Sequence, residues 1–136
     1  MSAKEHSHEE LPLKGDIQKF WQERARLNEL VLGTRNLQIK RFFSLDHQSY
    51  QPGALPVKTK ELLGLVASLV LRCDDCINYH IVRCFQEGVT EAEFEETMAI
   101  GMVVGGSITI PHVRRAFKSW KELQEAAREA QEKHSK

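Results

Sequence analysis

Two cysteines in a C-x-x-C pattern, followed by a histidine, form the most chemically reactive motif of this chain. The segment reads C-D-D-C-I-N-Y-H-I-V-R-C and contains Cys73, Cys76, His80 and Cys84. If it is helical, each residue advances by about 100°, so all four side chains share one face. The spacing therefore predicts that two thiols and an imidazole lie close together.

A C-x-x-C pair at the start of a helix favours thiol–disulfide chemistry. Free N–H groups and the positive end of the helix dipole stabilise a thiolate there, and the second thiol is near enough to close a disulfide. His80 lies one turn beyond Cys76 and could take its proton or hold its thiolate as an ion pair. We assign Cys76 as the attacking thiol and Cys73 as the resolving thiol, although proximity to the dipole alone favours the reverse.

A packed core and a zinc site are two other interpretations of these residues. Cysteines and a histidine on one helix face are often ordinary core residues, and we interpret Cys84 in this way. A structural zinc site needs a second ligand pair from another segment, and the chain has no second C-x-x-C and no H-x₃-H. We expect neither a metal nor a cofactor.

Apolar side chains recur at three- and four-residue intervals along most of the chain, which predicts helices. These helices must therefore position the cysteines and the histidine. The pattern predicts an all-α fold. Helices are expected over residues 16–33, 34–45, 58–71, 73–87 and 90–104, and from Ile110 or Pro111 to about 125. Thr90 with Glu93 is a capping-box signature, and Gly88 is suited to end the preceding helix. The helix over 58–71 is apolar on nearly every face, as is typical of a central position in a bundle or of a subunit interface.

A single domain is expected, because 136 residues are enough for one core and too few for two. We place this domain at residues 15–125. Residues 1–14 are polar and without periodicity, so they are predicted to be a mobile tail that includes His6 and His8. Residues 126–136 lose the apolar face of the last helix and are predicted to fray.

The charge balance limits the partners of the protein. There are 19 Lys and Arg against 19 Asp and Glu, so no global field attracts nucleic acid or anionic lipid. The N-terminus lacks the pattern of a signal peptide, and no apolar stretch reaches the ~18 residues that span a bilayer. Three cysteines, an odd number, argue against a secreted disulfide scaffold. We expect a cytoplasmic protein that binds neither nucleic acid nor membrane.

Residues 58–115 resemble the carboxymuconolactone decarboxylase family, in particular its alkylhydroperoxidase D-like branch. The matching pieces are KTKELLGLVASLVLRCDDCINYH, QEGVTEAEFEE and MVVGGS. In that branch a Glu is followed twelve residues later by C-x-x-C, and a His follows four residues after the second cysteine. Glu61, Cys73, Cys76 and His80 meet every one of these intervals.

The resemblance implies a helical bundle that assembles as a homo-oligomer, a trimer or a hexamer. It also implies a peroxidase whose substrate is a hydroperoxide or a small disulfide and which a thiol reductant restores. In this scheme a sulfenic acid forms on Cys76, Cys73 closes the disulfide, and Glu61 joins His80 in a proton relay. From the residues alone, Glu61 is either a first-turn charge favoured by the helix dipole or a partly buried acid near the active face.

The chain departs from the better-known members of this branch at one position. They have His just before the second cysteine, whereas this chain has Asp75. A carboxylate beside the thiols raises the pKa of a cysteine, which opposes its activation. A slower or more specialised thiol oxidoreductase would still need only the cysteine pair and a base.

Two other functions would rest on different residues. Lactone decarboxylation needs a cation for carboxylates and a proton donor at carbon, and has no use for two thiols. Its candidate basic patch consists of His112, Arg114 and Arg115. A non-enzymatic oligomeric module, for redox sensing or partner binding, would instead use aromatic residues at its interfaces, namely Phe20, Trp21, Phe42 and Phe43.

Overall fold

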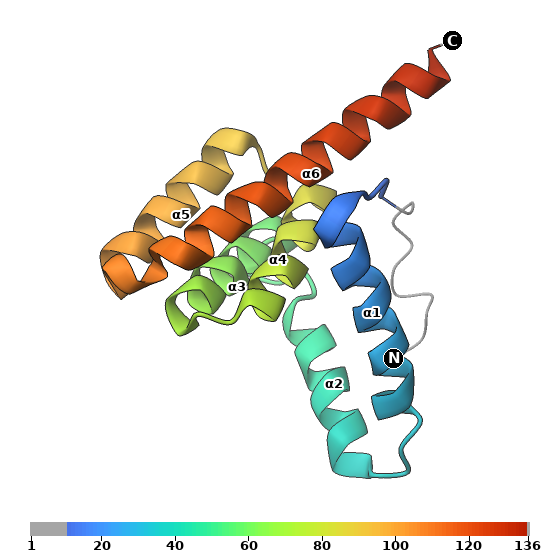
Figure 1. Ribbon diagram of the computed structural model, residues 1–136. Coiled ribbons are helices and arrows are strands. Elements are labelled where there is room, and N and C mark those ends of the chain that lie inside the picture. Colours follow the sequence, from blue (N-terminus) through green and yellow to red (C-terminus); the bar gives the residue numbers. More distant parts are fainter. Residues whose placement is uncertain (1–10, 136) are drawn as a thin grey trace.

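The computed structural model describes residues 11–135 and shows an all-α protein (Figure 1). Its helices are α1 (Gly15–Leu32), α2 (Leu37–Ser49), α3 (Val57–Leu71), α4 (Asp74–Gln86), α5 (Glu91–Gly105) and α6 (Ile110–His134), with a short 3-10 helix η2 (Ser107–Thr109) before α6. No strand occurs within the described residues. The predicted fold class is confirmed.

The second helix begins and ends later than the sequence predicted. It was expected over residues 34–45, but Asn36 is its N-cap, and the Asn36 side chain accepts a hydrogen bond of 2.9 Å from the backbone N–H of Ile39. An Asn in this position fixes the start of a helix because it satisfies an N–H that has no partner within the helix. The helix then continues to Ser49, up to the turn that precedes Pro52.

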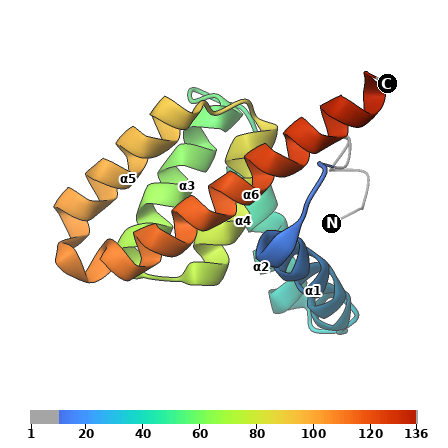
Figure 2. The ribbon, with the colours of Figure 1, turned by 45° about the horizontal axis from the view of Figure 1, so that its top comes forward.

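The body of the molecule consists of α3, α4, α5 and α6. Helix α3 packs against both α4 and α5, and α6 packs across α4 (Figures 1 and 2). Trp120 of α6 lies at the centre, stacked on Phe94 with ring centroids 4.6 Å apart and in edge contact with Phe85. Aliphatic residues such as Leu65 and Ile81 complete this core, and their burial supplies most of its stability.

Helices α1 and α2 run together away from this body (Figure 1). Helix α1 is attached to α6 at its first turn, where the Glu122 carboxylate accepts hydrogen bonds from the N–H groups of Asp16 and Ile17 at 2.9 and 3.2 Å. Ile17 is buried in the core, and Gly15 has a φ of 63°, with Glu122 in the space that a side chain would need. A carboxylate from α6 therefore provides the cap that fixes the start of α1.

Helix α3 is buried on two sides but not all round. Leu63 and Leu71 are 51% and 77% exposed, and α5 and the turn after it expose Val103, Val104 and Ile108. Apolar side chains on this scale of exposure are typical of surfaces that are covered by another molecule. Within one chain, α3 does not occupy the fully central position that its composition allowed.

The remaining predictions concern the caps and the ends of the chain. The capping box of Thr90 and Glu93 is present, and Gly88 adopts a φ of 79° beyond the end of α4. Before α1, Leu11 and Leu13 pack against the core. Helix α6 continues to His134 and buries Ala126, while His6 and His8 lie outside the described residues. No helix within residues 11–135 is both long and apolar enough to cross a bilayer.

Candidate active site

Cys73 is the N-cap of α4, at a sharp turn between α3 and α4. Arg72 closes α3 in the left-handed conformation with a φ of 60°, and the backbone N–H of Cys73 donates to the carbonyl of Ser68. The Cys73 Sγ atom accepts a hydrogen bond of 3.3 Å from the backbone N–H of Cys76, and Cys73 is close enough to the Cys76 thiol to raise its pKa. The turn therefore holds both sulfur atoms on one side of the first turn of α4.

Cys76 is a weak acid in this environment. The residue is exposed by its accessible surface, but partial desolvation of the thiol raises its pKa most, followed by Cys73 and then the charge of Asp75, so that its pKa is about 11. The predicted direction of the Asp75 effect is confirmed. The backbone hydrogen bond at the start of α4 lowers the pKa of Cys76, in the expected direction, but desolvation and Cys73 outweigh it. Cys76 is therefore a neutral thiol near pH 7 and needs a base in order to attack.

We expect the reaction of Cys76 with iodoacetamide to become about tenfold faster with each pH unit from 7 toward 11, because only the thiolate reacts. Cys73→Ser removes a hydrogen bond and a negative charge that raise the pKa, so the pKa should fall and the rate at pH 8 should rise. Asp75→Asn should act in the same direction but less, because the charge of Asp75 is the smaller cause. Mass spectrometry of the labelled peptide measures the labelling rate of each variant as a function of pH. An unchanged pKa of Cys76 in Cys73→Ser would contradict the described influence of Cys73 on this thiol.

Glu61 and His80 form a buried pair between α3 and α4. Glu61 is 1% exposed and His80 is 8% exposed, and Nδ1 of His80 lies 2.8 Å from Oε1 of Glu61. Arg83, one turn along α4, approaches the other carboxylate oxygen with Nε at 3.4 Å. Of the two interpretations of Glu61, the structure favours the buried acid beside the cysteines over the exposed first-turn charge.

This pair determines which nitrogen of His80 carries the proton. The carboxylate accepts a hydrogen bond from Nδ1–H, so Nε2 is left with a lone pair. Tyr50 OH lies 3.4 Å from Nε2, and burial together with the charge of Glu61 raises the pKa of Tyr50 to about 12, so that its hydroxyl remains a donor. At this length the contact is weak, and Nε2 is available to accept a proton from a neighbouring thiol.

Two residues missed by the sequence analysis shape this arrangement. Tyr50 follows α2, between two predicted helices, and Lys60 folds this stretch back by donating to the carbonyls of Ser49 and Gln51. Gly64 lies on α3 against the imidazole, and a methyl group there would be 2.6 Å from His80 Cε1 and 2.7 Å from the Tyr50 hydroxyl. Neither role has a signal in the sequence, because both depend on how α2 and α4 meet α3.

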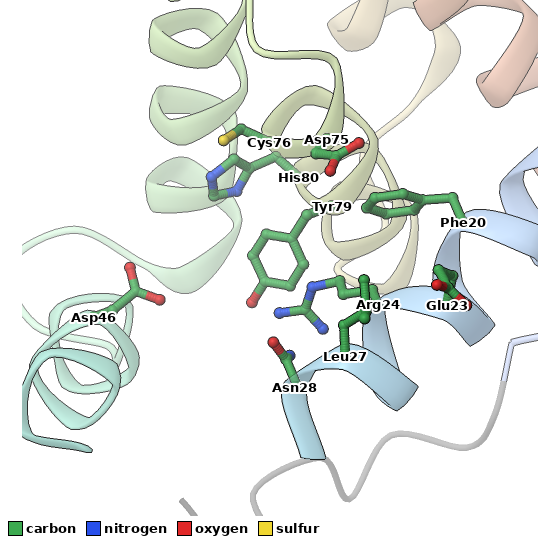
Figure 3. Close-up of a pocket in the computed structure, with 10 residues that line it drawn as sticks. All are labelled: Phe20, Glu23, Arg24, Leu27, Asn28, Asp46, Asp75, Cys76, Tyr79 and His80. Carbon is green, nitrogen blue, oxygen red and sulfur yellow. The ribbon is translucent and has the colours of Figure 1, made fainter. Parts of the chain in front are cut away.

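Cys76 and His80 open onto a pocket of about 480 Å³ between α1, α2 and α4. Figure 3 shows the Cys76 sulfur beside the His80 ring, with Tyr79 below them and residues of α1 opposite. The opposite wall contains Phe20 and Leu27, which are apolar, as well as Arg24. A pocket of this size that combines an apolar wall with a few polar groups is typical of a small-molecule site.

The comparison with protein families decides the classification. A model of the carboxymuconolactone decarboxylase family matches residues 39–119, more than half of the chain. This chain belongs to the carboxymuconolactone decarboxylase family. The matched segment includes Glu61, Cys73, Cys76 and His80, while α1 lies outside it.

Solved structures agree with this classification. Two crystal structures of one Thermotoga maritima protein are 59% and 56% identical to this chain, with TM-scores of 0.77 and 0.79. They cover 79% and 82% of this chain and 95% of their own. One is described as a carboxymuconolactone decarboxylase family protein for which a role in the antioxidative response has been suggested. A family member from Legionella pneumophila, 21% identical with a TM-score of 0.71 over 84% of this chain and 99% of its own, shares the fold.

A curated relative matches a shorter segment. An uncharacterized protein of Cupriavidus necator is 32% identical over 56 residues, which are 41% of this chain. The match covers half of the length of that relative.

The basic patch suggested for lactone decarboxylation is used for another contact in this family member. The His112 Nδ1 atom lies 2.7 Å from Asp74 Oδ1, and Arg115 Nε donates to Asp74 Oδ2 at 3.0 Å. These contacts tie the first turn of α4 to α6. None of His112, Arg114 and Arg115 lines the pocket of Cys76.

The other candidate residues are distributed between the core, the pocket and the surface. Cys84 is fully buried, as the sequence predicted, and burial raises the pKa of its thiol far above the ordinary value. Phe20 lines the pocket, Trp21 stacks near Tyr79 with centroids 6.0 Å apart, and Phe42 is exposed. Within residues 11–135 no three His, Cys, Asp or Glu side chains are grouped as they would be around a metal ion.

Proposed function

We propose that this protein is a thiol–disulfide oxidoreductase of the peroxidase type, with Cys73 and Cys76 as the redox pair. The observation that carries the proposal is the placement of Cys73 and Cys76 at the start of α4, where the Cys73 sulfur lies 3.3 Å from the Cys76 backbone nitrogen, beside a buried Glu61–His80 pair and at the edge of a pocket. Two thiols in contact can supply two electrons, and a histidine held by a carboxylate can move the proton that this chemistry needs.

The first step is the attack of Cys76 on the hydroperoxide. Nε2 of His80 takes the thiol proton, and the resulting thiolate attacks the terminal oxygen of the O–O bond. That bond breaks, the sulfur becomes a sulfenic acid, and the alkoxide leaves with the proton from His80 as an alcohol. Glu61 stabilises the imidazolium between the two proton transfers and keeps Nδ1 protonated.

The second step closes the disulfide. The Cys73 sulfur attacks the sulfenic sulfur of Cys76, an S–S bond forms, and the hydroxyl group leaves as water with the thiol proton. Two electrons from an external thiol reductant then return both cysteines to thiols and release an oxidised disulfide of that reductant. Cytoplasmic thiols would suit this last step, because they keep accessible disulfides reduced.

The suggested antioxidative role of the Thermotoga maritima protein supports this proposal, since that protein is 56% identical over 82% of the chain. The same chemistry would also apply to a small disulfide substrate, with sulfur in place of oxygen as the atom attacked.

Titration of the thiols with a hydroperoxide tests the proposal. The fully reduced protein has three thiols, and one equivalent of cumene hydroperoxide should leave one, on Cys84. Peptide mapping should find the Cys73–Cys76 disulfide, and excess thiol reductant should restore three thiols. Retention of all three thiols after hours with peroxide would rule out the proposed function.

We also propose that the protein is a homo-oligomer, a trimer or a hexamer. The exposed apolar side chains of α3 and α5, such as Leu71 and Val103, support the proposal because they have no cover within residues 11–135. Native mass spectrometry should give three or six times the chain mass of 15.6 kDa. A purely monomeric mass at micromolar concentration would contradict it.

A further inference from the structure

Arg24 is a charged residue in the pocket whose charge is not matched by a direct partner. Its side chain is half-buried, and its guanidinium lies over the Tyr79 ring, 4.2 Å from the centroid, and 5.2 Å from the centroid of Trp21. Within residues 11–135 it has neither an ion pair nor a hydrogen-bond acceptor. Burial lowers its pKa, but the group stays protonated at any physiological pH.

The carboxylates around the pocket do not neutralise Arg24. Glu23 is paired with Arg26 through contacts of 2.9 and 2.6 Å. Asp46 faces the pocket from α2 and acts on Arg24 through its charge, but it lies beyond ion-pair distance (Figure 3). Asp75 lies beside Cys76, away from the guanidinium. These three carboxylates are exposed and screened by water, whereas Arg24 is partly desolvated.

A half-buried guanidinium with unused N–H donors is strongly stabilised by a bound anion. It has five N–H donors in a fork that matches a carboxylate, and the pairing strengthens when water is excluded. Asn28 lies one turn along α1, also half-buried, and its side-chain amide points to the same part of the pocket (Figure 3). The aromatic faces of Tyr79 and Trp21 hold the guanidinium in place without consuming its donors.

We infer that Arg24, with Asn28 beside it, binds the carboxylate of a substrate whose hydroperoxide group reacts at Cys76. The substrate class is then an amphipathic one, a hydroperoxide of a carboxylic acid with an apolar chain along Phe20 and Leu27. The hydroperoxide group in this assignment rests on the proposed peroxidase function. The carboxylate site itself depends only on the geometry of α1 and α4.

Binding of a redox-inert probe tests the carboxylate site independently of catalysis. Octanoate and 1-octanol share an apolar chain and differ in charge. The difference between their affinities for the reduced protein, measured by calorimetric titration, therefore reports the contribution of the carboxylate. Octanoate should bind at least tenfold more tightly. Arg24→Gln should remove this difference, Arg24→Lys should retain part of it, and Asp46→Asn should strengthen octanoate binding because it removes a nearby negative charge.

The matched control is Arg26→Gln, which removes the same charge from α1 at an exposed position paired with Glu23. It should leave the preference for octanoate intact. Equal binding of octanoate and octanol to the wild-type protein, or an equal loss in Arg24→Gln and Arg26→Gln, would overturn the assignment. Circular dichroism of each variant separates a lost contact from a lost fold.

Kinetics then connect this site to the reaction. A fatty acid hydroperoxide and its methyl ester differ only at the carboxylate, so Arg24→Gln should raise KM for the acid about tenfold, leave its kcat nearly unchanged and leave the ester unaffected. If neither hydroperoxide is consumed while octanoate binding still depends on Arg24, the peroxidase function fails and the carboxylate site remains. If both are consumed equally well by wild type and Arg24→Gln, the carboxylate assignment fails and the peroxidase remains.

Discussion

Cys76→Ser is expected to abolish hydroperoxide-dependent turnover, with a loss on the order of a thousandfold or more. The sulfur of Cys76 is the atom that lies beside His80 and lines the pocket, and a serine hydroxyl at this position is far less nucleophilic. The substitution removes one exposed sulfur atom and should leave the fold unchanged. The measurement is peroxide consumption in the presence of dithiothreitol.

The other two cysteines provide matched controls for this result. Cys73→Ser should also stop turnover, but dimedone should trap a sulfenic acid on Cys76 because no second thiol is present to close the disulfide. Cys84→Ser should retain nearly full activity, because Cys84 is buried in the core and does not line the pocket. If Cys84→Ser were inactive and Cys76→Ser active, the assignment of the redox pair would be wrong.

Glu61→Gln is expected to lower kcat by about a hundredfold or more while the fold is kept. The Gln side chain has the same shape, but its two ends differ: the guanidinium of Arg83 attracts the amide oxygen, so the NH₂ group faces His80. His80 would then accept at Nδ1 and carry its proton on Nε2, where it could no longer take the proton of Cys76. The measurement is kcat for hydroperoxide consumption in the presence of dithiothreitol.

Glu87→Gln is the control for this prediction, because it makes the same chemical change in another carboxylate that contacts Arg83. Glu87 lies 3.6 Å from the Arg83 guanidinium, on α4's C-cap, and has no part in the Glu61–His80 contact. It should leave kcat within about twofold. An equal loss in both variants would mean that Arg83, rather than the histidine tautomer, is what Glu61 supports.

The sequence predicted the parts of the site that lie on one helix. Helical periodicity places Cys73, Cys76 and His80 on one face of α4, and the spacing from Glu61 to Cys73 linked α3 to that face through the family resemblance. Local spacing is informative here because a helix has only one geometry.

Residues from other helices could not be predicted from the sequence. Tyr50, Gly64 and Arg24 reach the site only through the packing of α2, α3 and α1 against α4. Of the causes that raise the pKa of Cys76, the sequence predicted only the charge of Asp75, because desolvation and the influence of Cys73 depend on how tightly the turn between α3 and α4 closes. The exposure of one side of α3 depends on tertiary packing in the same way.

The hydrogen bonds from Asp16 and Ile17 to Glu122 set an order in which the molecule is completed during synthesis. Glu122 is 106 residues later than Asp16, so the start of α1 has no carboxylate cap until α6 has left the ribosome. Helices α3 and α4, with both thiols and the histidine, emerge well before that point. A nascent chain therefore contains both cysteines and the histidine before the wall that carries Arg24 can be fixed in front of them.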